Sequence, residues 1–157
     1  MYQADPTEAL RAVAERLRSG GVVAFQELAA AALPWQPPKL PLLTAVASWV
    51  RGAFARSGTH ANVGWELYWR MSDAGLTPDL APIAEIPLQL GPGSGAYRRW
   101  AVLVRSLQPK IIEYGLATEA EIAIDSLEER LREEAQTNRA SIPLLSSVLI
   151  GQWARKP

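Results

Sequence analysis

The chain has 157 residues, of which 48% are hydrophobic and 20% are charged, so it can bury a sizeable core and has the composition of a globular domain. Sixteen basic residues balance sixteen acidic ones, which gives no electrostatic reason to expect a nucleic acid or an anionic membrane as a partner. The absence of cysteine excludes disulfides and thiolate chemistry, and the single histidine, His60, excludes a histidine-rich metal site.

No targeting segment is visible in the sequence. Asp5 and Glu8 occupy the region where a secretory signal needs a basic stretch followed by an apolar one. The longest apolar stretch, residues 28–33, is too short to cross a bilayer. The sequence therefore predicts one domain over residues 1–157 that is soluble and cytoplasmic, does not bind a membrane and holds no metal.

The chain starts with a helix followed by a strand. Asp5 is the expected N-cap and Glu8 completes the pattern of a capping box, while residues 20–21, both glycine, stop the helix. Residues 21–27, Gly-Val-Val-Ala-Phe-Gln-Glu, follow as a continuous apolar run that ends in two polar residues. Such a run predicts a strand that is covered on both faces, as in the middle of a parallel α/β sheet.

Two residues in this first part of the chain are candidate bases. Ligands of open α/β sheets bind at the carboxyl ends of strands, which favours Glu27 as a group that faces a substrate and accepts a proton. The alternative is an exposed carboxylate that caps the next loop. His60 is the second candidate, because imidazole exchanges protons near neutral pH, and its alternative is a solvated loop residue.

Further elements follow in order along the chain. Apolar spacing predicts helices over residues 42–56, 63–74 and 97–107 and a charged helix from 125 to about 136, with a capping box at 118–121. Residues 79–90 are extended but interrupted by prolines, which indicates an edge strand. Residues 109–114 fit either a helix or a strand. Residues 147–155 fit a terminal strand.

Aromatic residues provide the remaining substrate candidates. Trp65, Tyr68 and Trp69 lie at helical spacing and could form a wall for an organic substrate or a cation, although packing into the core is the more common role. Tyr97 begins a helix after a glycine-rich loop, where it could line the mouth of a pocket or simply lie at the surface.

The glycine-rich loop, residues 91–96, fits the dinucleotide fingerprint G-x-G-x-x-A, and Glu113 follows at a suitable distance. Pro87 is unsuitable for a central strand before it, and Pro92 removes a backbone donor that a phosphate needs. Too few elements also remain after Glu113. We therefore interpret the motif as a connecting loop.

The order of these motifs resembles class I S-adenosylmethionine-dependent methyltransferases. Asp5-Pro6 with Ala9-Leu10, then residues 16–18 and 20–27, is similar to the passage from strand four to strand five of that family. Residues 124–127, 129–132 and 149–157 are similar to the end of such enzymes, which finish in an antiparallel last strand. The resemblance covers nearly the whole chain.

The resemblance implies the C-terminal half of a Rossmann-like methyltransferase. The expected fold is a partial α/β sheet, with core strand 21–27, edge strand 79–90 and antiparallel strand 147–155, covered by several helices. The cofactor would be S-adenosylmethionine and the substrate a small organic molecule. Tyr2 and Gln3 would lie near the methionine part of the cofactor, and their alternative is a frayed N-terminus without a role. Gln26, Trp65, Tyr68 and Tyr97 would face that substrate.

The family's glycine-rich cofactor loop and ribose-binding acid precede strand four, so the resemblance implies that this chain is inactive alone. A different hypothesis is a non-catalytic interaction module. With strand four absent, the open edge of strand 21–27 could pair with a second copy or with a separate N-terminal half. A third interpretation is a gene fragment.

Overall fold

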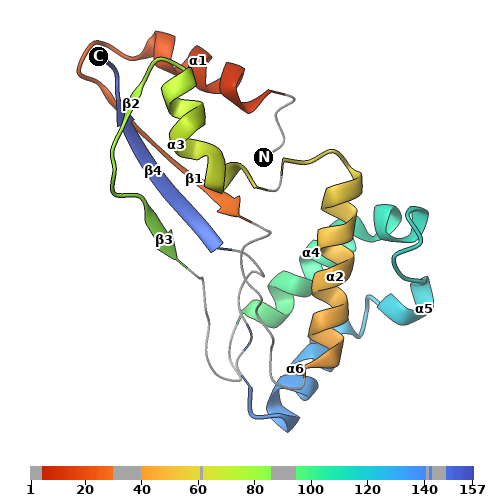
Figure 1. Cartoon of the computed structure of the whole chain (residues 1–157). Coiled ribbons are helices and arrows are strands. Elements are labelled where there is room, and N and C mark those ends of the chain that lie inside the picture. The colour runs from red at the N-terminus through yellow and green to blue at the C-terminus, as the bar shows by residue number, and fades with distance from the viewer. Residues whose placement is uncertain (1–4, 30–39, 61, 86–94, 141, 143–147) are drawn as a thin grey trace. The chain divides into compact units, whose positions relative to one another are not determined.

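The computed structural model describes residues 5–29, 40–60, 62–85, 95–140, 142 and 148–157 (Figure 1). The chain forms two compact units. Unit 1 consists of residues 1–32, 59–86 and 147–157, and unit 2 of residues 33–58 and 87–146. None of the described helices combines the length and the apolar character that crossing a bilayer requires.

Unit 1 is built on an antiparallel sheet. Its strands are β1 (Val22–Ala29), β2 (Thr77–Pro78), β3 (Ile83–Glu85) and β4 (Val148–Arg155). β4 lies in the middle, with β1 on one side and β2 and β3 on the other, and it runs antiparallel to all three (Figure 1). The predicted C-terminal strand and its antiparallel direction are confirmed. Of the predicted edge strand 79–90, residues 83–85 form β3, residues 79–82 are not in a strand, and residues 86–90 lie outside the described residues.

The first strand lies where the sequence predicts it, but the predicted parallel pairing and the predicted cover on both faces are wrong. Within the described part of the chain, β1 pairs with β4 alone, and the pair is antiparallel. Its side chains alternate, with Val22 50% exposed and Ala24 exposed, whereas Val23 and Phe25 are half-buried. An apolar run shows that a strand can be buried on both faces. It does not show that both faces are covered.

The buried face of the sheet carries helices α1 (Pro6–Arg16) and α3 (Val63–Asp73). α1 begins at the predicted N-cap, where one carboxylate oxygen of Asp5 accepts hydrogen bonds from the backbone N–H groups of Thr7 and Glu8 at 2.8 and 3.2 Å. The expected capping box does not form, because Glu8 pairs with Arg11.

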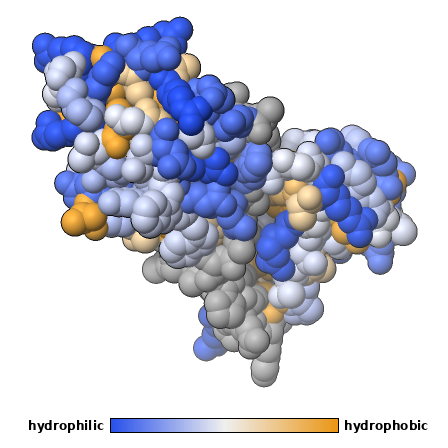
Figure 2. Space-filling view, turned by 45° about the horizontal axis from the view of Figure 1, so that its top comes forward, coloured by the Kyte–Doolittle hydropathy of each residue, from blue (hydrophilic) through white to orange (hydrophobic). Residues whose placement is uncertain are grey.

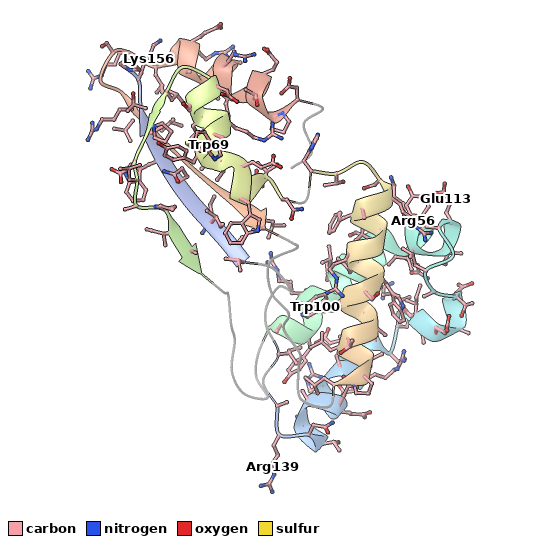
Figure 3. All side chains as sticks on the ribbon, viewed as in Figure 1. Arg56, Trp69, Trp100, Glu113, Arg139 and Lys156 are labelled. Atoms are coloured by element: carbon pink, nitrogen blue, oxygen red, sulfur yellow. The ribbon has the colours of Figure 1, made fainter. Side chains whose placement is uncertain are left out.

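The other end of α1 is capped by the last strand. The ammonium of Lys156, which follows β4, donates to the backbone carbonyls of Ala14 and Leu17, both at 2.8 Å. Figure 3 shows Lys156 beside the end of α1. A cation at a helix C-terminus satisfies the carbonyls that have no partner within the helix and opposes the helix dipole.

α3 packs closely on β1 and is tied to α1. Its side chains Val63, Leu67 and Met71 are buried, and the guanidinium of Arg70 donates to the hydroxyl of Thr7 at 3.0 Å. At Gly64 the two backbones approach so closely that a Cβ would lie 2.9 Å from the carbonyl oxygen of Glu27. Glycine therefore allows α3 to start directly against the carboxyl end of β1.

Unit 2 is helical. It contains α2 (Pro41–Arg56), α4 (Ala96–Glu113), α5 (Glu119–Ile122) and α6 (Leu127–Thr137). α2, α4 and α6 pack against one another around Trp100, which is 1% exposed and is labelled in Figure 3. The segment predicted as either helix or strand is helical as far as Glu113, since α4 continues through Pro109.

Carboxylates cap two of the helices of unit 2. The predicted capping box is confirmed at α5, where the Thr118 hydroxyl accepts from the Glu121 N–H at 3.2 Å and the Glu121 carboxylate accepts from the Thr118 N–H at 2.7 Å. The pKa of Glu121 is lowered because its carboxylate accepts from the Thr118 N–H and also from the Thr118 hydroxyl, at 2.7 Å. At α2, the carboxylate of Glu134 accepts from the N–H groups of Leu42 and Leu43 at 2.7 and 3.1 Å.

Candidate functional site

Unit 1 contains a pocket between α1, β1 and α3 with a volume of about 210 Å³. This volume is below the roughly 300–1,000 Å³ of sites that hold drug-sized ligands, so the pocket suits a small organic molecule better than a nucleoside cofactor. Its lining is apolar apart from one carboxylate and consists of Pro6, Ala9, Leu10, Val13, Phe25, Glu27, Val63 and Leu67.

The pleat of β1 determines which of its side chains reach this pocket. Phe25 and Glu27 are two residues apart, so both point to the face that α1 and α3 cover. Opposite them on β4 stand Gln152 and Ile150, both buried. The side-chain amide of Gln152 donates to the backbone carbonyl of Asp79 at 2.7 Å. Among the described residues that line the pocket, Glu27 is the one with an ionisable side chain.

The two helices supply the walls of the pocket. α1 contributes residues at helical spacing on one side, and α3 contributes its first residue, Val63, and Leu67 one turn later. The Arg70–Thr7 hydrogen bond joins the two helices, and Lys156 fixes the far end of α1 to β4. The close approach at Gly64 sets the height of α3 above Glu27.

Gln26 and Glu27, predicted together, lie on opposite faces of the sheet. Gln26 is exposed on the face away from α1 and α3, whereas Glu27 is half-buried in the pocket. His60 is exposed in the turn that precedes α3 and is not part of the pocket lining. Tyr2 and Gln3 lie outside the described residues, as does most of the glycine motif at residues 91–96.

The aromatic residues of α3 lie on its outer side. Trp65 is 55% exposed and Trp69 is 68% exposed, so the expectation that they pack into the core is wrong. Trp69, labelled in Figure 3, makes an edge-to-face contact with Tyr68, with ring centres 5.1 Å apart and planes at 82°. These three side chains form a surface cluster and do not line the pocket.

Tyr97 belongs to unit 2 and is buried, with 3% of its surface exposed, so a position at the surface is wrong for this residue. The guanidinium of Arg132 lies over its ring at 5.5 Å from the ring centre. This geometry is a cation–π contact between α6 and α4, which gives Tyr97 a packing role in the helical unit.

Sequence reasoning identified Glu27 but missed the residues that surround it in the pocket. The α1 wall, with Ala9 and Val13, reads in the sequence as an ordinary apolar helix face. The local signal that could have found the site is the strand period, which puts Phe25 and Glu27 on one face. Within the described ranges, no three acidic or histidine side chains gather where they could hold a metal ion.

Figure 2 shows hydrophobic colour on the described residues as separate small areas on the face in view, between hydrophilic ones. The described residues on that face therefore form no large apolar patch that would suggest a second binding site. A scan against models of protein families and a search of curated proteins both found no match to this chain. The function has to be inferred from the geometry of the site and from the order of its elements.

Proposed function

We propose that this chain is the C-terminal, substrate-covering part of an S-adenosylmethionine-dependent methyltransferase that acts on a small organic molecule, and that it is inactive alone. The observation that carries the proposal is the pocket at the carboxyl end of β1, with Glu27 as the one ionisable residue in the described part of its lining.

The order of the elements supports the same proposal. A capped helix leads into β1, and the last strand, β4, lies antiparallel beside it, as the resemblance implies for strand five and the final strand. Because Ala29 pairs with Val148 and Glu85 with Leu149, the carboxyl ends of β1 and β3 and the start of β4 lie at the same end of the sheet.

The chemistry requires little from the chain itself. Transfer of a methyl group from a sulfonium is an in-line displacement that depends on positioning and exclusion of water more than on a proton relay. Glu27 would orient the accepting group and take up its proton. The apolar walls from α1 and α3 would hold the body of the acceptor. The glycine-rich cofactor loop and the ribose-binding acid would come from a separate N-terminal half.

The test is calorimetric titration of the full chain with S-adenosylmethionine, together with a reading of the genomic sequence before the codon for Met1. We expect no saturable heat from the chain alone, and binding once an in-frame glycine-rich strand–loop–helix, or a separately encoded half, is supplied. Low-micromolar binding by the chain alone would contradict the proposed division into halves. The absence of any such complementing segment would contradict the methyltransferase proposal.

A second candidate function is a non-catalytic interaction module. The observation that favours it is β1, which pairs on one side within the described residues and exposes half of Val22. Exposed strand edges recruit other chains. Light scattering at high concentration should then give a dimer that Val22→Lys dissociates and that Val102→Lys, an equally exposed site in unit 2, leaves intact. A monomer would exclude self-pairing.

A further inference from the structure

The pocket of unit 1 combines features that select a particular class of ligand. Apart from Glu27, the described residues that line it are apolar. A carboxylate among apolar side chains has lost part of its hydration, and this loss is offset when an opposite charge binds. An organic cation gains both a charge-assisted hydrogen bond and burial of its apolar body, whereas an anion would meet repulsion.

Glu27 also takes part in an interaction within the chain. An ionised carboxylate has two oxygens with about four lone-pair sites, so an ammonium group can bind beside an existing partner. A primary ammonium has three N–H donors and can reach one carboxylate oxygen from several directions.

The size and depth of the pocket limit the body of the ligand. A volume of about 210 Å³ corresponds to roughly seven water molecules of the liquid, which admits one aromatic ring with a short side arm. Phe25 stands next to Glu27 on the same face of β1, and side chains two residues apart on a strand are separated by roughly 6.6 Å. A ring placed on Phe25 therefore lies one short alkyl arm from the carboxylate.

We propose that this pocket binds a small primary arylalkylamine in its cationic form, with the ammonium on the Glu27 carboxylate and the ring between Phe25 and Leu67. As the identity of a methyl acceptor, this inference rests on the proposed function. As a binding site it does not, because the pocket lies wholly within unit 1 and its occupation requires no cofactor.

The experiment titrates the full 157-residue chain, labelled with nitrogen-15, with three probes of nearly equal size: benzylamine, benzyl alcohol and benzoate. Amide shifts are recorded at neutral pH, where benzylamine is a cation. We expect saturable shifts at Phe25, Glu27 and Leu67, with benzylamine binding at least tenfold more tightly than benzyl alcohol and benzoate not binding. Equal affinity for the amine and the alcohol would overturn the inference, and so would the absence of saturable shifts.

Two substitutions locate the charge, with a matched control. Glu27→Gln keeps the shape of the side chain, and we expect it to reduce the affinity for benzylamine to that for benzyl alcohol. Glu15→Gln removes the same charge from the exposed face of α1 and should change neither affinity. Retention of the tenfold preference in Glu27→Gln would show that Glu27 does not bind the ammonium.

A third substitution tests the location of the ligand. Ala9→Phe places a ring inside the pocket and should weaken the binding of both the amine and the alcohol at least tenfold; Val13→Phe replaces it if the amide spectrum shows a loss of fold. Unchanged binding in a folded variant would place the ligand elsewhere. The titration with S-adenosylmethionine is a separate measurement. Its failure would not affect the proposed amine site, and failure of the amine titration would leave the order of the strands as support for the methyltransferase proposal.

Discussion

Gly64→Ala is expected to destabilise unit 1, because α3 starts directly against the backbone of β1. The added methyl group would lie 2.9 Å from the carbonyl oxygen of Glu27, 3.0 Å from that of Leu28 and 3.1 Å from the carbonyl carbon of Leu28. All three are backbone atoms, and β1 is held in place by its ladder with β4. The strand cannot yield without losing hydrogen bonds, so α3 has to move away.

The magnitude follows from two opposing effects. Insertion of a methyl group into a closely packed contact typically costs about 1–3 kcal/mol of unfolding free energy. Replacement of glycine by alanine in a helix returns roughly 0.5–1 kcal/mol. We therefore expect a net loss of about 1–2 kcal/mol. A lifted α3 also widens the pocket, since Val63 and Leu67 line it, and benzylamine should bind less tightly.

Gly52→Ala is the matched control in unit 2. Its methyl group would lie 2.8 and 3.0 Å from the two terminal carbons of the Leu116 side chain, which is half-buried and can turn away. The helix propensity gained in α2 then offsets the small cost, and we expect a change within about 0.5 kcal/mol of zero. The same substitution thus meets backbone at one site and a flexible side chain at the other.

The assay is urea unfolding followed by circular dichroism, with amide hydrogen exchange to assign any loss to unit 1 or unit 2. Hydrogen exchange is needed because two compact units need not unfold in a single transition. Gly64→Ala with wild-type stability, or Gly52→Ala with an equal loss, would refute the reasoning from backbone contact.

Three further predictions concern the caps. Glu134→Ala should lower the stability of unit 2 by about 1–2 kcal/mol in urea unfolding, because the N–H groups at the start of α2 lose the carboxylate that accepts from them. The control Glu133→Ala changes the exposed neighbouring residue and should alter the stability by no more than about 0.5 kcal/mol. Equal effects of the two substitutions would contradict the cap. Lys156→Met should cost unit 1 about 1 kcal/mol by releasing the carbonyls of α1, and exposed Arg155→Met should not; the contrast in hydrogen exchange of α1 is the measurement. The hydrogen bonds from Thr118 lower the pKa of Glu121 in the folded state. The Glu121 carboxylate therefore stabilises the fold at pH values above its unfolded-state pKa, and this contribution is lost as the pH falls through the folded-state pKa. Glu121→Gln should flatten the acid side of a plot of stability against pH, and an unchanged plot would count against the cap.

Local signals were enough to predict several elements. Asp5 marks the start of α1, Thr118 with Glu121 marks α5, and the apolar run of residues 148–150 marks the start of β4, because each pattern involves residues a few positions apart. The exposed half of β1 left no such signal. Val22 and Ala24 are apolar like their half-buried neighbours, and which face is covered depends on how α1 and the more distant α3 pack on the strand.

The candidate site was predictable to the same degree. Glu27 could be named from its place at the end of a strand, but its neighbours Val13, in the preceding helix, and Leu67, in a helix far along the chain, read as ordinary apolar positions. Trp65 and Trp69 show the opposite case. Their spacing indicated packing, yet on α3 the buried side is already filled by Leu67 and Met71, which leaves the two indoles outside.

The position of β4 in the chain has a consequence for synthesis on the ribosome. It is the last of the described strands to be synthesised, yet each of the other three is hydrogen-bonded to it. Val22, for example, can pair with Arg155 only after the end of the chain has been made. Pairing over so large a separation is slow, because a long loop has to close first. The nascent sheet therefore stays unassembled until the final stretch emerges, and a premature stop codon before residue 148 would leave β1, β2 and β3 exposed to chaperones and proteases.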